Sequence, residues 1–194
     1  EAEPDLGVPT ANGYLLSSTT AGTRSWINPA TNLAAPGNNT QVVFNNNGVL
    51  ASAASLVYDT ATGRVGINTN SPSARLDVAG DIKVNSNVTF NSEAITLATT
   101  VKTQIASFTV ASFRSGKLVV QAYDSVTGEV QVSELLVAHN GTTASATEYG
   151  IVFTGSNSLV TYDVDISGSN VRLMATRTTA NSTQYKVSET LIVA

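Results

Sequence analysis

The sequence predicts an all-β protein built of two parts. Residues 1–100 are predicted to form an extended, β-rich stalk or connector, and residues 101–194 a globular antiparallel β-sandwich of jelly-roll-like type. Three observations lead to this prediction. Apolar and polar residues alternate with a period of two in the second part. Turn residues recur there about every ten residues, as in sandwich domains. A sustained helical pattern is found in neither part.

One hairpin near the C-terminus carries the clearest strand signal. Apolar residues occupy every second position from Val160 to Ile166, and polar residues occupy the positions between them. Gly168 and Ser169 then fit a two-residue type II′ turn, in which glycine supplies the positive φ. The alternation resumes at Val171, which predicts the returning strand of the hairpin.

Five further strands are predicted in the second part, each rich in β-branched and aromatic residues and bounded by turn signals. They cover residues 103–113, 117–124, 129–138, 146–154 and 184–193. In one of them Val130 and Val132 are out of phase with Leu135 and Val137. Either a β-bulge at Ser133 or burial on both faces of the strand would explain this slip.

The first part is rich in turn residues, with all five prolines and 13 of the 17 asparagines of the chain. Its apolar segments are short and lie at residues 14–16, 41–44, 55–58, 64–67, 75–78 and 82–90. Isolated strands of this length bury too little apolar surface to be stable in water. We therefore expect several copies of the chain to complete one another's core. The sequence also allows a single helical turn at residues 51–54 and a helical segment at residues 92–99, although threonine disfavours a helix in the second.

Composition excludes several classes of function. The net charge is −4 and only 12% of residues are charged, which argues against a nucleic-acid partner. The chain has no cysteine and a single histidine, so we expect no thiolate or multi-histidine metal site and no cofactor. Its apolar runs are too short for membrane insertion, and we see no signal peptide. Because the chain opens with Glu1, we expect a processed chain or a fragment.

Three segments of the first part carry the motifs of a known family. They are ANGYLLSSTTAGTRSW at residues 11–26, TQVVFNNNGVLA at 40–51 and GRVGINTNSPSARLDVAGDI at 63–82. In this order they resemble elements of tailed-bacteriophage fibre proteins, and the resemblance covers residues 10–85. Asn68 stands where these fibres usually have glycine, a mild change because asparagine tolerates the left-handed conformation.

The resemblance implies a trimeric, extended, β-rich component of a virion. We therefore expect a non-enzymatic homotrimeric fibre, either a tail or a head fibre, with an intertwined stalk and a β-sandwich that attaches to its target. The expected partners are copies of the chain, other virion proteins, and a host-surface glycan or receptor. The alternatives are a capsid-decorating or neck-attached virion protein, a glycan-cleaving tailspike, and a bacterial surface adhesin module.

A turn at His139, Asn140 and Gly141 is the candidate receptor-contact loop. Asn-Gly is a strong hairpin signal, so the side chains of this turn are expected at an exposed tip. A histidine there could contact a receptor, or three copies could share an axial metal ion. The simpler interpretation is an exposed turn histidine without further function.

Asp163 and Asp165 lie two residues apart on one strand face. They could begin a Ca²⁺ site or form a glycosidase pair, but a solvated strand face is the favoured interpretation. Trp26 is interpreted as a packing anchor rather than a sugar-stacking platform. The turns at Asp59–Gly63 and Asp124–Gly128 are expected to be structural, with aspartate accepting backbone hydrogen bonds.

Overall fold

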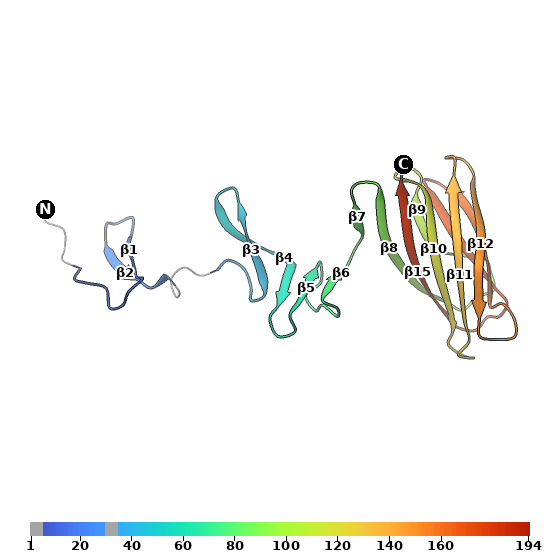
Figure 1. The fold of residues 1–194 in the computed structure, drawn as a ribbon, viewed down its shortest axis with the longest axis horizontal. Coiled ribbons are helices and arrows are strands. Elements are labelled where there is room, and N and C mark those ends of the chain that lie inside the picture. Colours follow the sequence, from blue (N-terminus) through green and yellow to red (C-terminus); the bar gives the residue numbers. More distant parts are fainter. Residues whose placement is uncertain (1–5, 30–34) are drawn as a thin grey trace. The chain divides into compact units, whose positions relative to one another are not determined.

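A computed structural model of the chain describes residues 6–29 and 35–194, so Glu1 lies outside the described range. The described residues form fifteen β-strands arranged in four sheets, which confirms the all-β prediction (Figure 1). The chain divides into two compact units, Glu1–Ala79 and Gly80–Ala194. This division lies about twenty residues before the predicted one at residue 100, because a strand assigned to the stalk belongs to the sheet of the second unit.

The first unit contains a hairpin and a separate four-stranded sheet. The hairpin is formed by β1 (Leu15–Ser18) and β2 (Arg24–Ile27). The sheet has the order β3-β4-β5-β6, with strands β3 (Gln41–Asn46), β4 (Val49–Asp59), β5 (Arg64–Ile67) and β6 (Leu76–Val78). The pairing of β5 with β6 is parallel, and the others are antiparallel. The alternative of a helical turn at residues 51–54 is wrong, because these residues belong to β4.

The second unit contains a six-stranded and a three-stranded sheet. The larger sheet has the order β12-β11-β10-β15-β8-β7, formed by β7 (Ile82–Val84), β8 (Val88–Leu97), β10 (Phe113–Asp124), β11 (Val130–His139), β12 (Ala144–Phe153) and β15 (Thr183–Val193). The smaller sheet has the order β13-β14-β9, formed by β9 (Thr103–Thr109), β13 (Val160–Ser167) and β14 (Asn170–Arg177). Figure 1 shows β8, β15, β10, β11 and β12 side by side.

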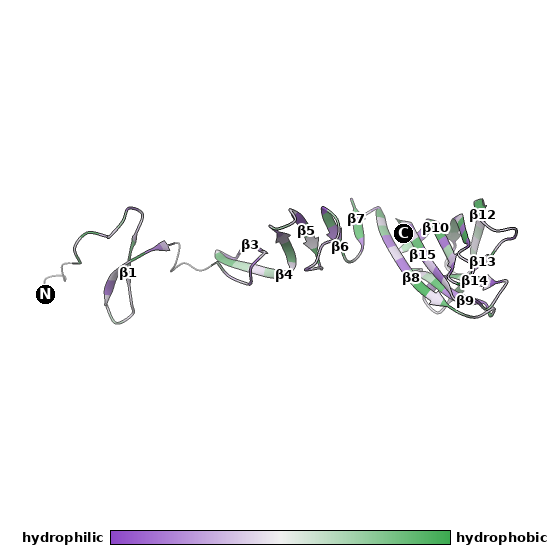
Figure 2. Ribbon diagram, turned by 90° about the horizontal axis from the view of Figure 1, so that it is seen from below, coloured by the Kyte–Doolittle hydropathy of each residue, from purple (hydrophilic) through white to green (hydrophobic). Residues whose placement is uncertain are grey.

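The hydrophobic core of this unit lies between its two sheets, as a β-sandwich requires. Both sheets contribute buried apolar residues, among them Ile105, Phe108, Leu118, Val120, Leu135, Val137, Val160, Val171, Leu173, Tyr185, Val187 and Leu191. Figure 2 shows hydrophilic and hydrophobic stretches along β8, whose residues 91–93 are polar and whose residues 94, 95 and 97 are apolar. The strand order differs from a jelly roll, because β10, β11 and β12 form a simple meander within one sheet.

The strand β8 was not expected in the sandwich. The predicted segment 82–90 is interrupted by a turn in which Asn85 and Ser86 have φ of 47° and 58°. The chain then returns as β8, which pairs with β15 from Thr183↔Leu97 to Ile192↔Val88. The alternative of a helical segment at residues 92–99 is therefore wrong.

Two local features were predicted in the second part, a hairpin turn and a change in the phase of apolar residues along one strand. Ser167 pairs with Asn170, so Gly168 and Ser169 form the predicted two-residue turn, with φ of 59° at Gly168. On β11 the predicted slip has a different origin. Inward positions alternate without interruption but begin with polar residues, and the register shift lies where Val132 and Glu134 pair with β12.

Candidate interaction surfaces

The sheet formed by β4, β5 and β6 has one face made entirely of apolar side chains. In one row Tyr58 pairs with Val65, which pairs with Leu76. The next row pairs Leu56, Ile67 and Val78 in the same way. Residues that pair across strands share a face, so we call Leu56, Tyr58, Val65, Ile67, Leu76 and Val78 the bare face. Tyr58, Ile67 and Leu76 are 47%, 41% and 57% exposed.

The opposite face of this sheet is covered by the chain's own loop, residues 68–75, which joins β5 to β6. A Cβ atom at Gly66 would lie 2.2 Å from the carbonyl oxygen of Thr69, so glycine is needed for the loop to approach. The Arg64 Nη1 donates a hydrogen bond of 2.9 Å to the carbonyl oxygen of Pro72. One face of the sheet is therefore covered within the chain, and the bare face is not.

Polar side chains hold the two ends of this loop. Asp77 accepts hydrogen bonds of 2.8 Å from both the backbone N–H and the hydroxyl of Ser73, which hold the pKa of Asp77 below its usual value. Asn68 has φ of 59°, and its Nδ2 donates to the carbonyl oxygen of Ala79 at 3.1 Å. The left-handed conformation expected at Asn68 is confirmed.

The first unit has almost no interior of its own. Among residues 6–29 and 35–79, those that are buried are Val57, Gly66 and Pro72. Large apolar residues are exposed instead: besides Tyr58, Ile67 and Leu76 of the bare face, they include Val8, Leu15, Leu16, Val43, Phe44, Val49 and Leu50. A single chain therefore leaves the hydrophobic core of this unit incomplete.

In the first hairpin, Trp26 holds the preceding segment in place. Its Nε1 donates a hydrogen bond of 3.0 Å to the carbonyl oxygen of Gly7, and its half-buried side chain pairs across the strands with Leu16. This placement fits the interpretation of Trp26 as a packing anchor.

The candidate receptor-contact loop joins β11 to β12. His139 is half-buried and its ring is held from both sides: Nε2 lies 2.6 Å from the carbonyl oxygen of Phe113, and Nδ1 accepts the Gly141 N–H at 3.0 Å. The Asn140 Oδ1 accepts the N–H groups of Thr142 and Thr143, both at 2.9 Å. The histidine thus organises the turn, and the exposed residues of the loop are Asn140, Thr142 and Thr143.

The aspartate of the β4–β5 turn has the predicted structural role. Asp59 accepts hydrogen bonds from the Ala61 N–H at 2.9 Å and the Thr62 hydroxyl at 2.6 Å, and Gly63 has φ of 67°. These hydrogen bonds lower the pKa of Asp59.

The corresponding aspartate of the sandwich, Asp124, is buried and supports two loops. Its Oδ1 accepts the N–H groups of Val126 and Thr127 at 2.9 and 3.1 Å, and its Oδ2 accepts the Asn181 amide at 3.0 Å. Burial opposes ionisation, yet these hydrogen bonds and the nearby Arg177 guanidinium hold the pKa of Asp124 below its usual value. Sequence reasoning identified the turn but not the contributions of Arg177, the last residue of β14, and Asn181, in the segment that follows it.

A polar cleft of about 350 Å³ lies beside Asp124, at the end of β11 opposite the His139 turn. Its lining includes Thr127, Glu129, Asn157, Thr178 and Asn181. These hydroxyl, amide and carboxylate groups suit a polar ligand, and sequence reasoning did not single them out.

The pair Asp163 and Asp165 does not form a shared site. Asp163 is paired with Lys102, and Asp165 accepts two hydrogen bonds from the Arg172 guanidinium at 2.8 and 2.7 Å. Each pairing lowers the pKa of its carboxyl group. Glycosidases need one carboxyl group with a raised pKa to act as an acid. The arrangement matches the favoured interpretation of a solvated strand face.

A second pair of carboxyl groups lies on the inner side of the large sheet. Glu189 is 1% exposed; its Oε2 accepts the Asn91 amide at 3.1 Å, and its Oε1 has no hydrogen-bond partner among the described residues. Burial, together with repulsion from Glu93, raises the pKa of Glu189 to about 7. The Glu93 carboxylate accepts the Ser107 N–H at 3.0 Å and so links the two sheets.

Two kinds of site are missing from residues 6–29 and 35–194. Acidic and histidine side chains do not gather in groups of three that could hold a metal ion. No helix in this part of the chain is both long and apolar enough to span a bilayer.

Comparison with known proteins gives partial structural similarities. No model of a known protein family matches the chain, and no curated protein sequence matches it. Among solved structures, it is similar to the tailspike protein gp49 of the Acinetobacter baumannii phage Fri1, a capsular polysaccharide depolymerase. The identity is 22% and the TM-score 0.37, over 57% of this chain and 19% of the tailspike.

Two further tailspikes show similarity at the same level. The tailspike of Acinetobacter phage vB_ApiP_P1 is 21% identical with a TM-score of 0.41, over 76% of this chain and 29% of that one. The tailspike of Acinetobacter baumannii phage AM24 is 10% identical with a TM-score of 0.36, over 61% and 29%. The chain thus spans less than a third of the length of each tailspike.

Proposed function

We propose that the chain is a structural protein of a tailed-phage virion and forms a homotrimeric fibre. Its first unit would form the stalk, and its second unit would be the head that each copy presents for attachment. The proposal combines the three fibre-type motifs of residues 10–85 with the state of the core in each unit.

The bare face of the β4-β5-β6 sheet is the observation that carries the proposal. It holds six apolar side chains in two rows, while the chain's own loop already covers the opposite face. Full burial of one such side chain contributes about 1.5–3 kcal/mol. Covering the six side chains of one bare face would therefore contribute on the order of 10 kcal/mol per copy at most, because Leu56, Val65 and Val78 are already half-buried. The number of copies comes from the resemblance to fibre proteins, since the bare face alone requires only that copies meet.

The second unit supports the part of the proposal that concerns attachment. Its core is complete within one chain, so each copy can present a rigid sandwich with loops at both ends. Three identical sets of loops on one fibre can bind a repetitive surface with an avidity well above the affinity of a single head. The His139 turn and the polar cleft beside Asp124 are the two loop regions available for a host-surface glycan or receptor, or for another virion protein.

We propose a mechanical rather than a catalytic role. The two strand carboxylates considered for glycan cleavage each have their own cationic partner, and the pKa of each is lowered. The titratable group with a raised pKa near neutrality, Glu189, is enclosed in the core and only 1% exposed. These observations disfavour a glycan-cleaving function for this chain.

Electron microscopy of intact phage particles with an antibody against the second unit tests the placement in the virion. The proposal predicts label on fibres that project from the tail or the head of the particle. Label on the capsid surface would favour a decoration protein instead, and absence of the chain from purified particles would contradict a virion role.

A further inference from the structure

The outer face of the six-stranded sheet, which points away from the core, has an apolar part at one end. Pairing places Ile82 beside Phe90 and Val84 beside Val88, and Val88 in turn faces Ile192 across the next pair of strands. Leu136 lies on the same face through the pairing of β10 with β11. We call Ile82, Val84, Phe90, Leu136 and Ile192 the outer patch. Each of the five is 44–49% exposed.

A shallow groove adjoins the outer patch, and two residues of the patch, Leu136 and Ile192, line it. Its volume is about 660 Å³, and small side chains form its floor between the walls made by Leu136 and Ile192. Ser115, Ala138 and Ser145 lie in one row of this floor, because each pairs with the next across β10, β11 and β12. A floor of small residues between apolar walls leaves room for apolar side chains of another surface.

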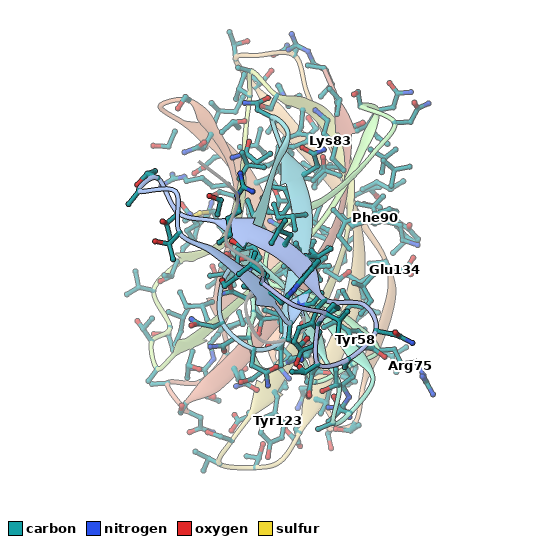
Figure 3. All side chains as sticks on the ribbon, turned by 90° about the vertical axis from the view of Figure 1, so that its left-hand side faces the viewer. Tyr58, Arg75, Lys83, Phe90, Tyr123 and Glu134 are labelled. Carbon is teal, nitrogen blue, oxygen red and sulfur yellow. The ribbon has the colours of Figure 1, made fainter. Side chains whose placement is uncertain are left out.

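Charges on this part of the face compensate each other. The Lys117 Nζ lies 3.1 Å from the Glu134 Oε2. Figure 3 labels Glu134 and, from the outer patch, Phe90. Their hydrogen bond raises the pKa of Lys117 and lowers that of Glu134. The outer face of the three-stranded sheet carries more charge, with the ion pairs of Asp163 and Asp165 at its surface. The outer patch therefore carries less charge than the outer face of the three-stranded sheet.

The size of the outer patch indicates what covers it. Six strands spaced about 4.8 Å apart and two rows of side chains give an area on the order of 350 Å² per copy. A free protein partner usually needs about 800 Å² per side for a stable interface. Copies already joined through the first unit have an effective concentration of about 1 mM, so a smaller surface suffices between them.

We infer that the outer patch is an interface in which the sandwich of each copy docks on that of a neighbouring copy. This inference rests on the proposed assembly of the chain into a fibre. It adds that the second units are not independent heads on flexible tethers but are held against one another through Ile82, Phe90, Leu136 and Ile192. The loops at the ends of the sandwich remain free to bind.

The absence of cysteine allows a direct test by single thiols. Ala138→Cys places a thiol in the groove, and Thr161→Cys places one on the outer face of the three-stranded sheet; both positions are exposed in the single chain. The full chain carrying each variant is reacted with a maleimide reagent in native buffer, and its mass is measured by light scattering. If the patches are docked about nine-tenths of the time, the thiol at 138 reacts about tenfold more slowly than the thiol at 161. Both should react equally after unfolding in urea.

A second variant separates docking from local effects. Leu136→Ser added to Ala138→Cys weakens the interface, so labelling should accelerate toward the rate at position 161 while the mass stays that of the assembly. Equal labelling at 138 and 161 in a trimer would overturn the docking of the second units and leave the proposed fibre intact. A monomeric full chain would overturn both.

Discussion

The Gln131 side chain satisfies both backbone polar groups of Val160, the first residue of β13. Its Oε1 accepts the Val160 N–H at 3.2 Å, and its Nε2 donates to the Val160 carbonyl oxygen at 3.0 Å. The same Oε1 also accepts the Leu159 N–H at 2.8 Å and the Ser158 hydroxyl at 2.9 Å. Gln131 is fully buried, so one amide side chain fixes the start of β13 in the smaller sheet to β11 of the larger one.

Replacing Gln131 by leucine should destabilise the second unit strongly. The substitution keeps a similar volume but removes the acceptor of the Leu159 and Val160 N–H groups, at about 1–3 kcal/mol for each group. We expect the free energy of unfolding to fall by about 3 kcal/mol or more. Urea denaturation measures this, with Gln184→Leu on the exposed face of β15 as the control. A Gln131→Leu variant as stable as this control would contradict the role of the side chain.

Replacing Glu189 by glutamine should stabilise the protein only at high pH. Because the pKa of Glu189 is raised from 4.5 to about 7 in the folded chain, its ionisation opposes folding. The cost is absent below about pH 4.5, grows up to about pH 7 and is complete above it, reaching about 3 kcal/mol. We expect Glu189→Gln to raise the melting temperature at pH 8.5 and to match the wild type at pH 4.5. Equal stabilisation at both pH values would point to a packing effect instead.

A charge on the bare face should prevent assembly. In one isolated chain Leu76 is largely exposed, so Leu76→Glu should cost little there. In the fibre, the introduced carboxylates would be buried beside one another without cationic partners. Each such uncompensated buried charge costs about 3–5 kcal/mol. Light scattering should show a single-chain mass for Leu76→Glu. Thr60→Glu, which adds the same charge in the exposed β4–β5 turn, should keep the wild-type mass; a matching mass for both variants would contradict the function of the bare face.

Two variants separate the structural and contact roles of the β11–β12 turn. His139→Ala removes the contacts of both ring nitrogens, so we expect a loss of about 1–2 kcal/mol in stability. Thr142→Lys changes the exposed tip and should leave the melting temperature within about 1 °C. If this turn contacts the receptor, the lysine variant binds host cells more weakly. Unchanged binding would assign attachment to another loop.

Local signals in the sequence were sufficient where neighbouring residues determine the conformation. The strand at residues 64–67, the turn at Gly168 and Ser169, and the left-handed Asn68 were all predicted and are all observed. In each case the decisive groups lie within a few residues, so chain chemistry alone specifies the geometry.

Long-range pairing was not predictable in the same way. The strand β8 finds its partner β15 about a hundred residues later in the chain, with Asn91 paired to Glu189. Its sequence contains polar residues and threonines, as a connector would. Its position in the sandwich depends on pairing with the edge of β15 that β10 leaves free. For this reason the second compact unit begins at Gly80, before the division expected near residue 100.

Buried polar groups were the second source of error. On β11 the inward positions include Gln131 and Ser133, while Val130 and Val132 face outward. An assignment from hydropathy alone reverses these positions, because it takes no account of the hydrogen-bond partners at the start of β13. Asn181 and Arg177, which support Asp124, were missed for the same reason.

The mass of the full chain in native buffer, measured by light scattering over a dilution series, tests most directly whether copies complete the first unit. A stable species near three times 20.1 kDa is predicted, with the β-rich signature of the folded chain retained at every dilution. A folded, soluble species of one chain, with the bare face exposed to water, would contradict it.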